Sequence, residues 1–517
     1  MRTSSGRSPR KAGTAKRRLA VGAAAVMVLS LGSAPAAQAT TPVDEAQLPT
    51  LVRTAAIKQH LQNLTTIAEY NGGNRATGTP GYDVAAKYVI DQLKRAGYQP
   101  VKHTYEFSEW VENSEPVLAQ TAPEAVEYAS GLDADFLAMS YSGSGDVTAP
   151  GVPVNADSAT SGCAASEFAG FPAGAVAIVK RGTCPFSQKA TNAAEAGAGA
   201  VIVFNHGATT DPSDTGPING TVTDLADIPV LGASPEVGAA LVAAGDELEL
   251  RVRVDAEIVT SNSYNITAET KGGKKDNVVV VGAHLDGVEE GPGINDNGSG
   301  VAAILEVAKQ LPKLGTPENK VRFAFWGSEE VGLVGSTKYV EALSEKELER
   351  IALYLNFDMI GSENYARLIY DGRGELPGSV APPSGSGAIQ RTFENYFSAK
   401  GLVAEPTEFS GRSDYQAFML AGIPSGGLFS GADGIKTEAQ VAHYGGTAGV
   451  QFDRNYHTPD DTIENINWDS VTELSGGIAY SVETFAQSTL PVNGVAPFSL
   501  GTQSSSGFDR VGSYWVR

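Results

Sequence analysis

Cysteine, histidine and tryptophan are scarce in this chain of 517 residues, which contains two, six and four of them respectively. Two cysteines, Cys163 and Cys184, cannot supply the four thiolates of a cysteine-type zinc site. Neither cysteine has a histidine beside it in the sequence, and no Gly-x-Ser-x-Gly pattern occurs. These absences disfavour the cysteine and serine hydrolases.

Long hydrophobic runs are missing after residue 39, whereas a membrane span needs about 20 apolar residues. Residues 1–39 are predicted to be a signal peptide, with a basic region free of acids, an apolar stretch over 19–31 and a small-residue cleavage site. A membrane anchor is the alternative, and Arg17-Arg18 leaves twin-arginine export open. We expect a secreted, extracellular protein in which the two cysteines form one disulfide bond.

Positive charge is also scarce, since 38 Lys and Arg stand against 59 Asp and Glu. Removal of residues 1–39 takes away seven positive charges and leaves 31 against 59, a net charge of −28. Nucleic acids and anionic membranes are polyanions, so neither is expected as a partner. We take a monomer as the default.

The rest of the chain contains two regions that differ in composition and pattern. Residues 124–255 hold short strand-like runs, both cysteines and a single histidine, and they predict a separate small domain. From residue 277 onward, apolar strands alternate with helices, which predicts an α/β fold with a mostly parallel sheet covered on both faces. The predicted strands are 277–283, 321–326 and 352–357, and the predicted helices are 51–70, 83–96, 298–311, 332–342 and 385–400.

Residues that can bind a metal follow these strands, at the edge where ligands of such sheets bind. They are His284 and Asp286 after the first strand, Asp296 before the next helix, Glu329 and Glu330 after the second strand, Asp358 after the third, and the later His457, which follows Tyr456. Taken alone, each of these residues could have an ordinary structural role. Asp296 could cap a helix, and Glu329 and Glu330 could interact favourably with a helix dipole. Together they favour zinc, and the several carboxylates favour two ions that share one of them.

The sequence resembles peptidase family M28, the co-catalytic zinc peptidases, and in particular the secreted bacterial aminopeptidases of that family. The similar segments occur in the family's order and are AHLDGVEEGPGINDNGSG, RFAFWGSEEVGLVGS, YLNFDMIG, GRSDYQAF, AGIPSGGLF and YHTPDDT, with NGGNRATGTPGYDVAAKYVIDQLKRAGY near the N-terminus. The resemblance covers roughly residues 51–120 and 260–487. It implies a mostly parallel, mixed sheet with helices on both faces.

The middle of the chain resembles a protease-associated (PA) domain, through Cys163 and the segment AGAVAIVKRGTCPFSQKATNAAEAGAGAVIVFN, which contains Cys184. In the family, such a domain is inserted into the peptidase. We therefore expect a signal peptide at 1–39, a catalytic domain at 40–123 and 256–490, a PA domain at 124–255 and a C-terminal tail at 491–517.

The M28 resemblance implies a role for each matching residue. His284, Asp296 and Asp358 would hold one zinc ion, and Asp296, Glu330 and His457 the other, with Asp296 bridging and a cis bond between Asp296 and Asn297. Glu329 would be the general base, Asp286 would orient His284, and Tyr456 would stabilise the oxyanion. Arg412 would position the substrate, or it would form an ion pair with Asp414.

The expected activity is hydrolysis of N-terminal residues, large and hydrophobic such as leucine, from peptides or proteins. Two alternatives keep the same fold: a carboxypeptidase or glutaminyl cyclase, and a non-catalytic receptor. Calcium binding also occurs in relatives, but the resemblance places no calcium ligands in this chain. The role of the PA domain and of the tail is left open.

Overall fold

The computed structural model describes residues 42–132, 134–208, 212–222 and 225–495. The predicted signal peptide lies outside these residues, as does the predicted tail from residue 496 onward. Within the described residues, no helix is long and apolar enough to cross a membrane.

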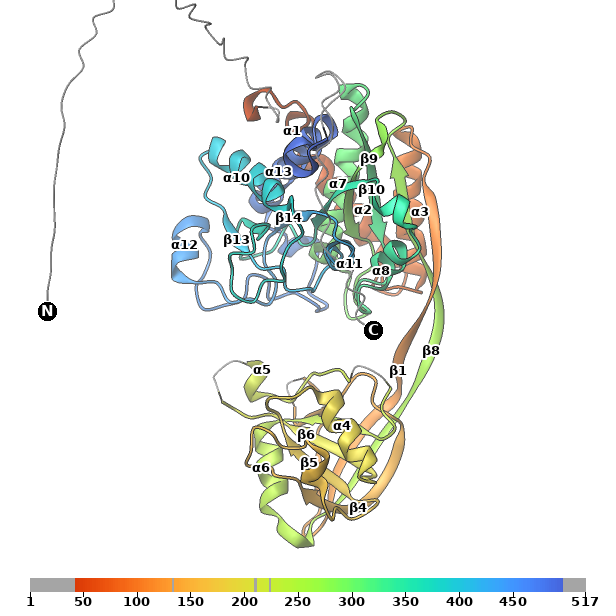
Figure 1. Ribbon diagram of the computed structural model, residues 1–517, viewed down its shortest axis with the longest axis vertical. Helices are drawn as coiled ribbons and strands as arrows, with labels where there is room; N and C mark the ends of the chain where they lie inside the picture. The colour runs from red at the N-terminus through yellow and green to blue at the C-terminus, as the bar shows by residue number, and fades with distance from the viewer. Residues whose placement is uncertain (1–41, 133, 209–211, 223–224, 496–517) are drawn as a thin grey trace, which may run out of the picture. The chain divides into compact units, whose positions relative to one another are not determined.

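A mixed, mostly parallel sheet forms the centre of the catalytic region (Figure 1). Its central strands β9, β10, β11 and β14 are parallel, whereas β8 pairs antiparallel with β10 and β12 pairs antiparallel with β14. The predicted fold class is thus confirmed. The strands, in spatial order, are β13 (Glu405–Thr407), β12 (Leu368–Tyr370), β14 (Ser425–Phe429), β11 (Ile351–Phe357), β9 (Lys274–His284), β10 (Asn319–Trp326) and β8 (Glu249–Glu269).

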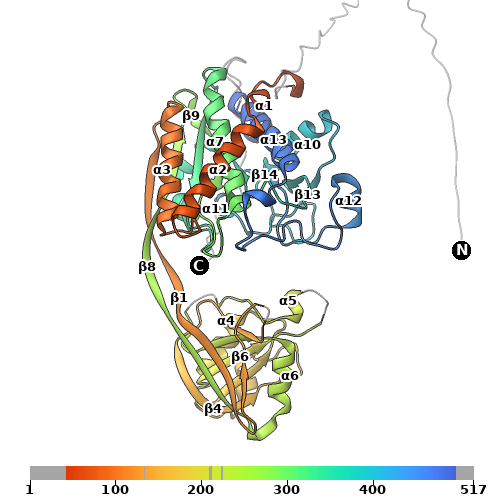
Figure 2. The ribbon, with the colours of Figure 1, turned by 180° about the vertical axis from the view of Figure 1, so that it is seen from behind.

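Helices cover both faces of this sheet, which explains why its central strands are continuously apolar. Val279 and Val281 of β9 belong to a core shared with α2, α3 and α7, which lie on the face seen in Figure 2. Val278 and Val280 belong to a second core, shared with α8 and α11. The helices of this region are α1 (Leu48–Leu51), α2 (Thr54–Tyr70), α3 (Pro80–Arg95), α7 (Gly300–Gln310), α8 (Val334–Glu341), α9 (Glu345–Leu348), α10 (Ser386–Ala399), α11 (Tyr415–Leu420), α12 (Glu438–Tyr444), α13 (Trp468–Gln487) and α14 (Leu490–Asn493).

A long antiparallel ribbon joins the catalytic sheet to the inserted region (Figure 1). Strand β1 (Val101–Ala122) pairs with β8 from Val101 opposite Thr267 to Ala122 opposite Glu249. One end of β8 pairs with β10 and the other end with β4. The domain limit expected between residues 255 and 256 falls inside β8, so the exact limits stay a prediction.

The inserted region is a small α/β unit with two apolar cores of its own. A disulfide bond joins Cys163 and Cys184, as predicted. The elements of this region are β2 (Val126–Tyr128), β3 (Phe136–Ala138), β4 (Gly145–Pro153), β5 (Val176–Lys180), α4 (Phe186–Glu195), β6 (Ala200–Phe204), α5 (Pro212–Thr215), β7 (Val230–Ala233) and α6 (Pro235–Ala243).

Candidate metal centre

The carboxyl ends of three parallel strands carry most of the predicted ligands. Strand β9 ends at His284, which lies opposite Trp326 at the end of β10. Glu329 and Glu330 follow β10, and Asp358 follows β11 directly. Because parallel strands end at the same edge of the sheet, residues far apart in the sequence come together there.

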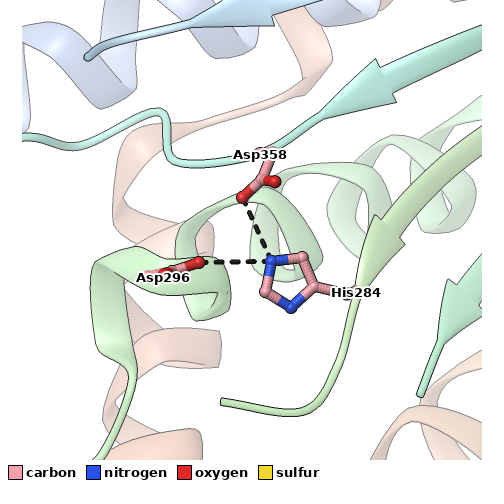
Figure 3. Close-up of side chains that lie close together, drawn as sticks. All are labelled: His284, Asp296 and Asp358. Atoms are coloured by element: carbon pink, nitrogen blue, oxygen red, sulfur yellow. Dashed lines mark hydrogen bonds and ion pairs between the residues drawn. The ribbon is translucent and has the colours of Figure 1, made fainter. Parts of the chain in front are cut away.

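His284, Asp296 and Asp358 form the first group (Figure 3). The His284 Nε2 atom lies 3.2 Å from Asp296 Oδ1 and 3.1 Å from Asp358 Oδ1. All three side chains are buried. Asp296 lies in the turn of residues 294–299 that precedes α7, and the peptide bond between Asp296 and Asn297 is cis, as the family resemblance implied.

Asp296, Glu330 and His457 form the second group. The His457 Nε2 atom lies 3.2 Å from Asp296 Oδ2 and 3.0 Å from Glu330 Oε2. The two oxygens of Asp296 thus face different imidazoles, Oδ1 toward His284 and Oδ2 toward His457. One carboxylate is therefore placed to serve two neighbouring ligand sets.

The electrostatics of the cluster fit a cation. Burial, together with the charge of Asp296, raises the pKa of Glu330 to about 7. Burial opposes protonation of His284, but the charges of Asp358 and Glu329 outweigh it and raise the pKa of the imidazole well above its usual range. Among the described residues, the buried atoms Glu330 Oε1 and Asp286 Oδ1 have no hydrogen-bond partner. Carboxylate and imidazole ligands of this kind suit zinc.

Asp286 links the first imidazole to the segment after β10. Its backbone oxygen lies 3.2 Å from His284 Nδ1, and its carboxylate Oδ1 lies 3.7 Å from the same atom. Its other oxygen, Oδ2, accepts a 3.3 Å hydrogen bond from the backbone N–H of Glu330. Asp286 thus contacts the first group through its backbone oxygen and the second group through its carboxylate.

Two further residues support the ligands, and the sequence reasoning missed them. Ser413 donates a 2.6 Å hydrogen bond to Asp358 Oδ2. Asp461 accepts hydrogen bonds of 2.7 and 2.9 Å from the backbone N–H groups of Asn295 and Asp296. Both lie in segments that resemble the family, but nothing in their residue type indicated these contacts.

A cavity of about 290 Å³ opens beside the cluster. Glu329 lines it, and Glu329 Oε2 lies 4.0 Å from His284 Nε2. Burial raises the pKa of Glu329 well above its usual range, and the charges of Glu330 and Asp358 act in the same direction. Much of the remaining wall is apolar, formed by Met359, Leu368, Tyr370, Phe429 and Phe452.

Tyr456 and Arg412 also line this cavity. The Tyr456 ring stacks on the His457 ring at 3.8 Å, and its hydroxyl lies 3.4 Å from Arg412 Nη2. Arg412 Nη1 lies 3.1 Å from both carboxylate oxygens of Asp433. The alternative of an ion pair between Arg412 and Asp414 is therefore wrong, because Asp414 is buried whereas Arg412 is exposed on the cavity side.

The chain is similar to known families and proteins. The profile of Peptidase family M28 matches residues 265–482, and that of the PA domain matches residues 147–241. An aminopeptidase of Pseudomonas aeruginosa is 47% identical over 453 residues, which cover 86% of this chain and 83% of that protein. This chain belongs to peptidase family M28. The prediction of an M28 aminopeptidase with an inserted PA domain is confirmed.

Another relative is a named aminopeptidase, and solved aminopeptidases share the fold. A probable leucine aminopeptidase 2 of Aspergillus fumigatus is 39% identical over 445 residues, 85% of each chain. An aminopeptidase from Aneurinibacillus sp. strain AM-1 superposes with a TM-score of 0.67 at 26% identity, over 89% of this M28 peptidase and 98% of that chain. A zinc aminopeptidase from Bacillus subtilis shares the fold, with a TM-score of 0.59 at 24% identity over 83% and 94% of the two chains.

Proposed function

We propose that this M28 peptidase is a secreted aminopeptidase that removes N-terminal residues from peptides with two zinc ions and Glu329 as general base. The bridging placement of Asp296, whose two oxygens face His284 and His457, is the observation that carries this proposal. His284, Asp296 and Asp358 would hold one ion, and Asp296, Glu330 and His457 the other. When bound, zinc supplies Lewis acidity and makes water a better nucleophile at neutral pH.

Glu329 is placed to move the proton. Its carboxylate lines the same cavity as Asp296 and Asp358, where the attacking water would bind. Glu329 would take the proton of the attacking water and pass it to the departing amine. Asp286 holds His284 in one orientation during this step, through contacts with the ring nitrogen Nδ1.

Tyr456 is placed to stabilise the developing oxyanion. Its side chain lines the cavity, and burial raises the pKa of its hydroxyl, so Tyr456 keeps its proton and can donate a hydrogen bond. Arg412 lies beside that hydroxyl and is held by Asp433. It would position the substrate at the mouth of the cavity.

The cavity suits a peptide with a free N-terminus and an apolar first side chain. Glu329 and Asp358 place negative charge where the α-ammonium of the substrate would lie. The apolar wall, which includes Met359, Phe429 and Phe452, suits a leucine-like side chain. Several relatives are named leucine aminopeptidase 2, which agrees with this preference.

Export rests on the predicted signal peptide. A probable lipoprotein aminopeptidase of Mycobacterium tuberculosis, LpqL, is 43% identical over 86% of this chain and 87% of that protein, which agrees with an extracellular or surface location. A monomer without nucleic-acid or membrane partners stays a prediction, as does any calcium site.

The proposal is tested by hydrolysis of leucine p-nitroanilide beside its N-acetylated form, with zinc quantified in the same preparation. We expect cleavage of the free amine only, loss of activity with a chelator and recovery with zinc. If neither compound is cleaved while two zinc ions are bound, the metal centre stands and the aminopeptidase assignment fails, which would favour the carboxypeptidase alternative.

A further inference from the structure

A buried arginine lies beside the metal centre and takes no part in the proposed reaction. Arg75 lies in the loop between α2 and α3, and its side chain is 0% exposed. A fully buried arginine is rare in proteins unless it is paired. Its three nitrogen groups donate hydrogen bonds to backbone carbonyl oxygens. The role of this side chain therefore depends on the segment that carries those oxygens.

All three oxygens belong to the segment of residues 285–295, which connects the proposed ligands His284 and Asp296. Arg75 Nη1 donates to the carbonyl of Leu285, the residue directly after His284. Arg75 Nη2 donates to the carbonyl of Gly293, and Nε donates to that of Pro292 at 3.1 Å. One rigid, planar group thus holds the segment at both ends, next to His284 and three residues before Asp296.

Gly293 makes room for the guanidinium group. A Cβ atom added to Gly293 would lie 2.6 Å from the carbonyl oxygen of Asp296 and 3.1 Å from Arg75 Nη2. Its φ of +62° is also one that side chains rarely adopt. At Gly287 and Gly298 the distances to Arg75 Nη2 would be 3.8 and 3.6 Å, which is ordinary van der Waals contact. Gly293 is therefore the position at which the close approach of Arg75 requires a glycine.

Arg75 also places a permanent positive charge among the acids of the centre. Burial lowers the pKa of its guanidinium, while the charges of Asp461, Asp286, Asp296 and Glu330 act in the opposite direction. Arginine keeps its proton in proteins, so this charge is present before any metal binds. It reduces the mutual repulsion of the carboxylates in the metal-free chain.

We propose that Arg75 is a positioning residue of the metal centre, which holds His284 and Asp296 at ligand spacing before zinc binds. This inference rests on the proposed two-zinc function. Arg75 bonds the backbone of the ligand segment and none of the ligand side chains, so it acts through that segment. A lysine could not replace it, because a single ammonium group cannot reach both ends of the segment in a fixed geometry.

The test measures zinc affinity in Arg75→Lys by competition with a chromophoric chelator. Supporting contacts of metal ligands typically contribute 10–100-fold in affinity, and we expect a loss in that range. Arg367→Lys is the matched control, since Arg367 is also buried and donates to Glu473 and to the carbonyl of Val403 away from the centre. Its zinc affinity should equal that of the unmodified enzyme.

The outcomes separate this inference from the proposed function. If the unmodified chain binds no zinc, the proposed function fails and the inference fails with it. If the unmodified chain binds two zinc ions and Arg75→Lys binds them equally tightly, only the role of Arg75 is overturned. In Arg75→Ala, added guanidinium ion should restore part of the lost affinity, whereas urea at the same concentration should not.

A second measurement separates the role of Arg75 from a failure of Arg75→Lys to fold. Hydrogen–deuterium exchange at residues 294–298 should be faster in metal-free Arg75→Lys than in the metal-free unmodified chain, whereas the inserted region should exchange equally in both. In both proteins Asp461 accepts hydrogen bonds from the N–H groups of Asn295 and Asp296, so a difference reports the loss of Arg75. Equal exchange at residues 294–298 in the two proteins would overturn the proposal.

Discussion

Ser413 donates a 2.6 Å hydrogen bond to Asp358 Oδ2, while the other oxygen of that carboxylate faces His284 Nε2 at 3.1 Å. The serine thus leaves Asp358 Oδ1 as the oxygen that faces the candidate metal centre. We expect Ser413→Ala to weaken zinc binding by about 10-fold, because the carboxylate becomes free to rotate. Zinc titration against a chelator measures this. Ser470→Ala is the control, since buried Ser470 donates to the carbonyl of Ile360 instead, and an equal loss in both variants would contradict the prediction.

Glu329 is expected to carry the proton transfer but to bind no metal. In Glu329→Gln, kcat on leucine p-nitroanilide should fall by about 10²–10⁴-fold, whereas the zinc content stays at two ions per chain. Glu408→Gln is the matched control, because Glu408 also lines the cavity but is not a proposed ligand or base. Loss of one zinc ion from Glu329→Gln would reassign Glu329 as a ligand.

Zinc affinity is expected to rise with pH between about pH 6 and 8. Burial disfavours protonation of His457, but its hydrogen bonds to Asp296 and Glu330 outweigh burial and raise its pKa to about 10. Metal-free His457 therefore carries a proton throughout this interval, and Glu330, with a pKa of about 7, carries one at its lower end. Zinc must displace these protons from His457 and Glu330. The displacement becomes easier as the proton concentration falls, so zinc should bind more tightly at higher pH. Calorimetric titrations at several pH values measure the slope, and a flat profile would refute the coupling.

Removal of zinc is expected to lower the melting temperature of the catalytic region. A ligand at 100 times its Kd stabilises the folded state by about 2.7 kcal/mol, so chelation should produce a clear downward shift in calorimetry. The inserted region contains none of the proposed ligands. If it melts as a separate transition, that transition should not move on chelation.

The disulfide bond between Cys163 and Cys184 is expected to stabilise the inserted region alone. The two cysteines are 21 residues apart, and closing a loop of this size contributes about 3 kcal/mol in the chain-entropy model. The variant Cys163→Ala with Cys184→Ala should therefore unfold its inserted region at lower denaturant concentration. Hydrolysis of leucine p-nitroanilide should stay unchanged, and lost activity would show that the inserted region acts on the catalytic site.

The sequence predicts the centre of the fold well, because its strands are apolar on both faces and are followed by helices. Strand β11 (Ile351–Phe357) and helix α10 (Ser386–Ala399) lie within two residues of their predicted limits. Helix α3 begins at Pro80 rather than at residue 83, because Thr79 caps it by accepting a hydrogen bond from the N–H of Tyr82. Thr-Pro is a helix-start signal that the surrounding glycines obscured.

Long-range pairing and backbone contacts could not be predicted. Strand β1 runs from Val101 to Ala122, with register irregularities between Glu112 and Val117. Its partner β8 lies more than a hundred residues away in the sequence, so no local pattern indicates the pairing. The contact of Asp461 with Asp296 could not be predicted for a similar reason. Asp461 accepts a hydrogen bond from the backbone N–H group of Asp296, and nearly every residue type has such a group.

The pairing of β1 with β8 brings the two ends of the inserted region close together in space, although they lie far apart in the sequence. Trp110 lies directly opposite Ile258, so the chain leaves and returns at neighbouring positions of two paired strands. An insertion with adjacent ends needs no rearrangement of its host. A short hairpin turn that joins residues 110 and 258 would close the catalytic chain on itself, so a chain shortened in this way is expected to keep the catalytic sheet.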